Sequence, residues 1–122
     1  MGLSRERLSP GDIGTALRQA VFQVDEVLRG LGLGPALVDC FATNGENLVA
    51  LHRSGTMALR WMDDIAELAG TLPDTLGRAA VTPFRCSLLL AGPQEVPDHF
   101  DPVPAHHLVL CGRTEPPVVE RL

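Results

Sequence analysis

Asn44-Gly45 is the dipeptide whose residue types most directly suggest chemistry, and it separates two short apolar runs, "ALVDCFAT" and "NLVALHR". A side-chain amide and a glycine N–H can together polarise a carbonyl group, as an oxyanion hole does. The same dipeptide between apolar runs is also the strongest short signal for a β-hairpin, because both residues tolerate positive φ. We expect a hairpin turn here, without a catalytic role.

The histidines and cysteines of the second half form the next group with possible chemistry. On a strand, His107 and Cys111 would share a face while His106 would point away, and His99 and Cys86 lie upstream. A structural zinc site uses four ligands, typically with closely spaced cysteine pairs, and no such pair occurs here. We therefore predict no metal site, with Cys111 packed in the core; a metal-binding protein that uses His99, His107 and Cys111 is the third alternative.

Asp63 and Asp64, with Glu67 one turn later, are the remaining cluster of acidic residues. They fit the negatively charged first turn of a solvated helix better than a pair of catalytic carboxylates. The sequence has no G-x-S-x-G motif and no glycine-rich phosphate loop, and "GLGLGP" follows a predicted helix instead of a strand. The sequence predicts no catalytic residues, no cofactor and no cofactor-binding residues.

A long helix near the N-terminus is the clearest element that would position these groups. Ser9 is placed as its N-cap, Pro10 as its first residue and Asp12 as the returning side of a capping box. "GLGLGP" ends it, because glycine allows a left-handed cap and Pro35 cannot continue a helix. Apolar residues recur along it at three- and four-residue steps: Ile13, Ala16, Leu17, Ala20, Val21, Val24, Leu28 and Leu31.

Three apolar runs follow, separated by Asn44-Gly45 and Ser54-Gly55, and they predict an antiparallel β-meander that needs cover on its faces. Residues 63–77 predict a short second helix. Within the proline-rich remainder, "FRCSLLLA" and "HHLVLCG" predict strands and residues 92–104 a long loop. We expect frayed residues at 1–8, one α+β domain over 1–122, and half of an αββα sandwich.

Composition excludes several function classes. The chain has 122 residues, of which 45% are hydrophobic and 20% charged, with a net charge of -5. An acidic chain without a basic stripe predicts no nucleic-acid binding. No signal peptide and no stretch long enough for a membrane span are recognised. The three cysteines are odd in number and widely spaced, which predicts reduced thiols, two or three of them buried, in a cytoplasmic protein.

Taken together, the helix, the turn and the later strand resemble the C-terminal half of class II glutamine amidotransferase domains of the N-terminal-nucleophile type. The nearest branch is that of the ergothioneine-pathway amidohydrolase, over roughly residues 17–61 and 106–116. In that branch a T-(N/D)-G turn precedes a strand ending in "LVAT-R", and a later strand reads "HLIISSEPL". The matching residues are Thr43, Asn44, Gly45, Leu48, Val49, Ala50, Arg53, His107, Leu108, Val109, Leu110, Glu115 and Pro116.

The resemblance implies a domain whose nucleophile lies elsewhere. The family cleaves glutamine-like amides with an N-terminal cysteine whose own amine acts as the base, whereas this chain begins Met1-Gly2-Leu3-Ser4. The family's oxyanion motif is H-N-G, but Thr43 stands at the histidine position, so no catalytic role passes to Asn44 or Gly45. We expect a truncated, degenerate or split amidotransferase part that is inactive alone, with a partner chain supplying the cysteine or with self-association. The alternative is a small acidic binding module without catalysis.

Overall fold

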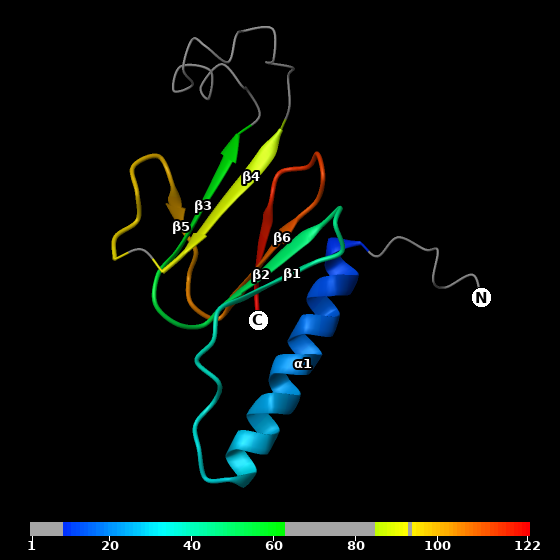
Figure 1. Cartoon of the computed structure of the whole chain (residues 1–122), viewed down its shortest axis with the longest axis vertical. Helices are drawn as coiled ribbons and strands as arrows, with labels where there is room; N and C mark the ends of the chain where they lie inside the picture. The colour runs from blue at the N-terminus through cyan, green and yellow to red at the C-terminus, as the bar shows by residue number, and fades with distance from the viewer. Residues whose placement is uncertain (1–8, 63–84, 93) are drawn as a thin grey trace, which may run out of the picture.

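Helix α1 and seven strands make up the fold of residues 9–62, 85–92 and 94–122, which are the residues that the computed structural model describes (Figure 1). The elements in chain order are α1 (Pro10–Gly30), β1 (Cys40–Thr43), β2 (Leu48–His52), β3 (Met57–Met62), β4 (Cys86–Ala91), β5 (Asp101–Pro102), β6 (His107–Cys111) and β7 (Val118–Arg121). The predicted α+β class is confirmed.

Helix α1 begins with the predicted capping box. The Ser9 hydroxyl accepts the Asp12 N–H at 3.1 Å, and the Asp12 carboxylate accepts the Ser9 N–H at 3.0 Å. The helix ends where Gly32 adopts a φ of +76° and donates its N–H to the Arg29 carbonyl. Only the N-terminal part of the predicted apolar stripe is buried in the described structure: Ile13 and Val21 are buried, whereas Val24 is exposed to solvent.

The larger sheet, which we call sheet A, has the strand order β1-β2-β6-β7 with every pair antiparallel. Side chains on one of its faces pack against α1. Val49, Leu51 and Leu108 are fully buried there and form one core cluster with Ile13 and Val21 of the helix. Helix and sheet therefore hold each other through apolar burial worth about 1.5–3 kcal/mol for each fully buried side chain.

The opposite face of sheet A packs against a second antiparallel sheet, sheet B, of order β4-β3-β5. Ala50 and Val109 of sheet A share a second core cluster with Met57 and Leu59 of β3. The layers therefore run helix, sheet A, sheet B, and strands β2 and β6 are buried on both faces. The sequence predicted half of an αββα sandwich, and the described residues contain one helix layer and two sheets.

The predicted β-meander is wrong in its third strand. Strands β1 and β2 do form the expected hairpin, but β3 pairs with β4 and β5 in sheet B. Both edges of β2 are taken, one by β1 and the other by β6, so no edge is left for β3. The Ser54-Gly55 turn, with Gly55 at a φ of +73°, carries the chain from one sheet to the other.

Two further short strands correct the description of the C-terminal part. The predicted loop at 92–104 contains β5, which pairs with Ala58 and Leu59 along the free edge of β3. The last residues form β7, which pairs with β6. Of the cysteines only Cys111 is buried, whereas Cys40 and Cys86 are half-buried. The predicted helix at 63–77 and the fraying at 1–8 lie outside the described residues.

Candidate functional site

Two buried polar residues stand at the end of β2, His52 as its last residue and Arg53 directly after it. Their exposed fractions are 2% and 8%, and they are the buried polar residues among those that the structure describes. Burying a polar or charged side chain is unfavourable unless hydrogen bonds compensate for the lost water. The partners of these two side chains therefore define the most organised polar centre of the described chain.

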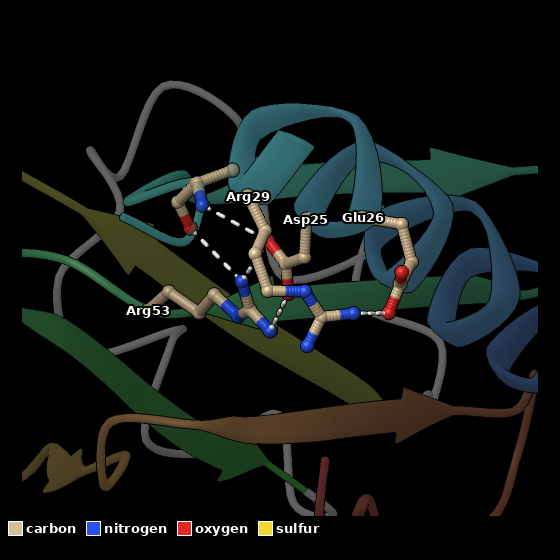
Figure 2. Close-up of polar contacts among 5 residues, drawn as sticks. Asp25, Glu26, Arg29 and Arg53 are labelled. Carbon is tan, nitrogen blue, oxygen red and sulfur yellow. Dashed lines mark hydrogen bonds and ion pairs between the residues drawn. The ribbon is translucent and has the colours of Figure 1, made fainter. Parts of the chain in front are cut away.

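Arg53 binds Asp25 of helix α1 through two parallel hydrogen bonds (Figure 2). Its Nη1 lies 2.9 Å from Oδ1 and its Nη2 lies 2.8 Å from Oδ2, which is the bidentate geometry that a guanidinium favours with a carboxylate. Nη1 also donates to the Ala36 carbonyl at 3.1 Å, and the Ala36 N–H donates to Asp25 at 2.9 Å. One closed network thus joins the helix, the segment after it and the end of β2.

The donors of this network stabilise the negative charge of the Asp25 carboxylate. The hydrogen bond from Arg53 holds the pKa of the Asp25 carboxyl below its usual value, and the bond from the Ala36 N–H acts in the same direction. The ring of Phe22 lies 6.0 Å from the Arg53 guanidinium carbon, at the limit of a cation–π contact. The Asp25 carboxyl is therefore favoured in its ionised form, and its ion pair with Arg53 anchors the C-terminal half of α1.

His52 binds Asp39, the residue that precedes β1. Its Nδ1 lies 3.0 Å from both carboxylate oxygens of Asp39. Asp39 also accepts the backbone N–H groups of Arg53 at 2.8 Å and Ser54 at 3.0 Å. Partial burial opposes ionisation of this carboxyl, but the two backbone donors and His52 outweigh it, so the pKa of Asp39 lies below its usual value.

Further histidines lie beside this pair at the same end of sheet A. His107 of β6 is opposite His52 in the register, so their side chains project from the same face of the sheet. The His106 N–H donates to the His52 carbonyl at 2.7 Å, and His106 has a φ of +62°. The Nδ1 of His107 lies 2.9 Å from the carbonyl oxygen of Ala105, so this ring is bonded to the segment directly before β6.

An imidazole held by a carboxylate is the arrangement that activates a nucleophile in catalytic triads. Here the imidazole is 2% exposed, which leaves a substrate almost no access to it. Burial raises the pKa of the Cys40 thiol, and the Asp39 charge raises it further; burial also raises the pKa of the Cys111 thiol. Thiols of raised pKa are poor nucleophiles. The contacts of His52 and Asp39 link the end of β2 to the segment that precedes β1.

Asn44-Gly45 is the hairpin turn that the sequence predicts. The Asn44 side-chain oxygen accepts the N–H groups of Glu46 at 3.0 Å and Asn47 at 2.8 Å, and the Gly45 N–H donates to the Thr43 hydroxyl at 3.0 Å. Gly45 has a φ of +91°, which glycine adopts without strain. The Gly45 N–H, one of the donors that an oxyanion hole would need, is therefore engaged in the turn itself, and the oxygen of the Asn44 side chain holds that side chain over the turn.

The other candidates from the sequence are not brought together. His107 and Cys111 lie on one face of β6, and Cys111 is buried in the core between the sheets. In the part of the chain that the structure describes, no three histidine, cysteine or acidic side chains converge on a point where a metal could bind. Asp63, Asp64 and Glu67 lie outside the described residues.

The partners Asp25 and Asp39 were not expected from the sequence. A usable signal does exist, because a strand buried on both faces that ends in His-Arg requires polar partners nearby. The two segments that carry the family resemblance, around residues 48–53 and 107–111, do lie side by side as β2 and β6, with Ala50 opposite Val109.

Neither a protein-family model, nor a curated protein, nor a solved structure matches the chain. No helix in the described ranges is both long and apolar enough to cross a membrane.

Proposed function

We propose that the chain is the C-terminal part of a class II glutamine amidotransferase-like domain that is inactive alone and acts in the cytoplasm. The observation that carries this proposal is the pairing of β2 with β6. The matching residues at 48–50 and 107–110 come from these two segments, which are far apart in the sequence and adjacent in one sheet. That sheet lies between a helix layer and a second antiparallel sheet, which is the layering expected for such a domain.

The polar cluster supports a scaffold role. Arg53, which matches the arginine ending the family's "LVAT-R" strand, bonds Asp25 and Ala36 and fixes helix α1 against the sheet. The cysteine thiols at 40 and 111 have raised pKa values, which disfavours thiolate chemistry at these two positions. The nucleophile then comes from another polypeptide segment that carries an N-terminal cysteine, and the two together complete the domain.

Glutamine hydrolysis provides the test. The purified chain is assayed for ammonia release from glutamine, alone and after co-expression with the reading frame immediately upstream in the native genome. We expect no release from the chain alone, and release from a complex whose second component begins Met-Cys and contains H-N-G. Substitution of that cysteine by serine should abolish release. Hydrolysis by the chain alone, or a complex without activity, would refute the proposal.

A second candidate is a binding module without catalysis, and one observation favours it. The end of α1 and the segment after it expose several large apolar side chains, namely Val24, Val27, Leu31, Leu33 and Leu37. Exposed apolar surface of this kind is typical of protein interaction sites. An upstream region without a Met-Cys reading frame would favour this module over the amidotransferase part.

A further inference from the structure

We propose that strand β1 is the site at which two copies of this chain pair edge to edge, antiparallel, about a two-fold axis at Ala42. Among the described residues, the strand lies at one edge of sheet A and pairs with β2 alone. This inference stands apart from the proposed function, because it follows from the open edge and not from the family resemblance.

The direction of the backbone groups along β1 follows from the ladder. The His52 carbonyl accepts from His106 on the β6 side, so the neighbouring Leu51 directs its backbone groups toward β1, where it is opposite Cys40. Because these directions alternate along a strand, Cys40 and Ala42 bond to β2. The N–H and C=O groups of Phe41 and Thr43 therefore point to the open edge.

The edge lacks three of the features that prevent pairing. Natural edge strands are protected by charged side chains, proline or a bulge, and also by being short; β1 has four residues and none of the first three features. Strand β1 reads "CFAT", and residues 40–45 carry no charge; the flanking acidic residues are Asp39, which binds His52, and Glu46. At the other edge of the same sheet, β7 carries Glu120 and Arg121. Sheet A therefore has one protected edge and one open edge.

A second copy fits this edge in one register better than in others. With Phe41 opposite Thr43 of the second copy, and the symmetric pair likewise, each pair exchanges two hydrogen bonds. Every outward-pointing group of the four-residue strand is then used. The two Ala42 residues face each other at the axis, where strands approach most closely and a small side chain is favourable. A strand that pairs with itself in this way forms a closed dimer and not a fibre.

Apolar side chains next to the edge would be covered by the same contact. Phe41 is 46% exposed on the strand itself, and Leu37 and Val38 are exposed just before it. Pairing would remove part of this surface from water, adding about 25 cal/mol for each Å² of apolar area buried. Hydrogen bonding thus fixes the register, and apolar burial adds affinity.

Sedimentation equilibrium of the full chain over a concentration series tests the proposal. We expect a monomer–dimer equilibrium that Phe41→Lys weakens at least about tenfold, since a charge on an edge strand opposes pairing. Leu90→Lys is the matched control, because it places the same charge on β4, the uncharged edge of sheet B. A wild-type chain that is monomeric throughout, or dissociation by Leu90→Lys and not by Phe41→Lys, would overturn the proposal.

Disulfide cross-linking gives an independent readout that does not depend on the folding of Phe41→Lys. In a Cys40→Ser background, Ala42→Cys places two thiols opposite each other at the axis, with Cα atoms about 4.5–5.5 Å apart, within disulfide reach. We expect rapid dimer cross-linking at position 42 on mild oxidation. Thr15→Cys, on an exposed turn of α1, is the control. Equal cross-linking rates for the two positions would contradict the two-fold contact at β1.

Discussion

Replacing Arg53 with methionine removes the guanidinium that ties β2 to helix α1, while the apolar stem keeps a similar volume. The Arg53 side chain is 6% exposed and makes three charge-assisted hydrogen bonds, two to Asp25 and one to Ala36. Breaking a buried ion pair by removing one partner costs about 3–5 kcal/mol. The Asp25 side chain left behind is 21% exposed and can be hydrated, so we expect about 2–3 kcal/mol for Arg53→Met.

Arg29→Met is the matched control on the same helix. Arg29 pairs with Glu26 one turn earlier, as Figure 2 shows. These side chains are 71% and 69% exposed. Exposed pairs at this spacing contribute at most about 0.5 kcal/mol, because water solvates both partners nearly as well apart as together. The two substitutions delete the same group, and Arg29 acts on Asp25 through its charge but not through a hydrogen bond, so their difference reports the hydrogen-bonded contacts of Arg53.

The assay is urea denaturation followed by circular dichroism, with thermal melts as a second measure. About 2–3 kcal/mol corresponds to a fall in Tm of roughly 10 °C for a domain of this size. Amide hydrogen exchange should also accelerate at Ala36, whose N–H bonds to Asp25. Equal losses of stability for Arg53→Met and Arg29→Met would refute the reasoning that the buried network anchors the helix.

Three further outcomes are expected. Leu51→Ala should lower the free energy of unfolding by about 2–5 kcal/mol in urea titrations, because it leaves a cavity at a fully buried position between β2 and α1. A loss below about 1 kcal/mol, which is typical of a surface substitution, would contradict that packing. Gly45→Ala should cost about 1–2 kcal/mol, since alanine is strained at a φ of +91°, whereas Gly30→Ala in the helix should cost nothing. The pKa of Asp39 is lowered on folding, so its contribution to stability is full above the usual carboxyl pKa of about 3.9 and is lost as the pH falls through the lower folded value. The stability gap between wild type and Asp39→Asn should therefore narrow below about pH 4, and a gap that widened there would contradict this sign.

Local signals in the sequence predicted the parts of the fold that depend on neighbouring residues. The Ser9–Asp12 capping box and the three- and four-residue apolar spacing determine where α1 begins and which side packs on the sheet. The Asn44-Gly45 turn closes through its own side-chain contacts, so the β1–β2 hairpin could be recognised from eight or so residues. These features require no knowledge of distant segments.

The features that the sequence did not reveal depend on distant contacts. The strand after Ser54-Gly55 does not pair with β2, because β6 already occupies the second edge of β2. Strand β6 lies much later in the sequence, so this competition cannot be recognised from the neighbouring residues. Strand β5 has two residues and contains Pro102, so no periodicity marks it. The pairing of Arg53 with Asp25 and of His52 with Asp39 depends on how the segment after α1 returns to the sheet. Side-chain spacing along the chain carries no information about that path.

The pairing of β2 with β6 also has a consequence for the nascent chain on the ribosome. Ala50 finds its partner Val109 only 59 residues later, so the central sheet cannot close until β6 has been synthesised. At a synthesis rate of about 5–20 residues per second, several seconds pass between the synthesis of β2 and that of its partner β6. The segment "LVALH", buried on both faces in the finished fold, is meanwhile exposed as an apolar strand. It is therefore the segment that a chaperone would need to shield during translation.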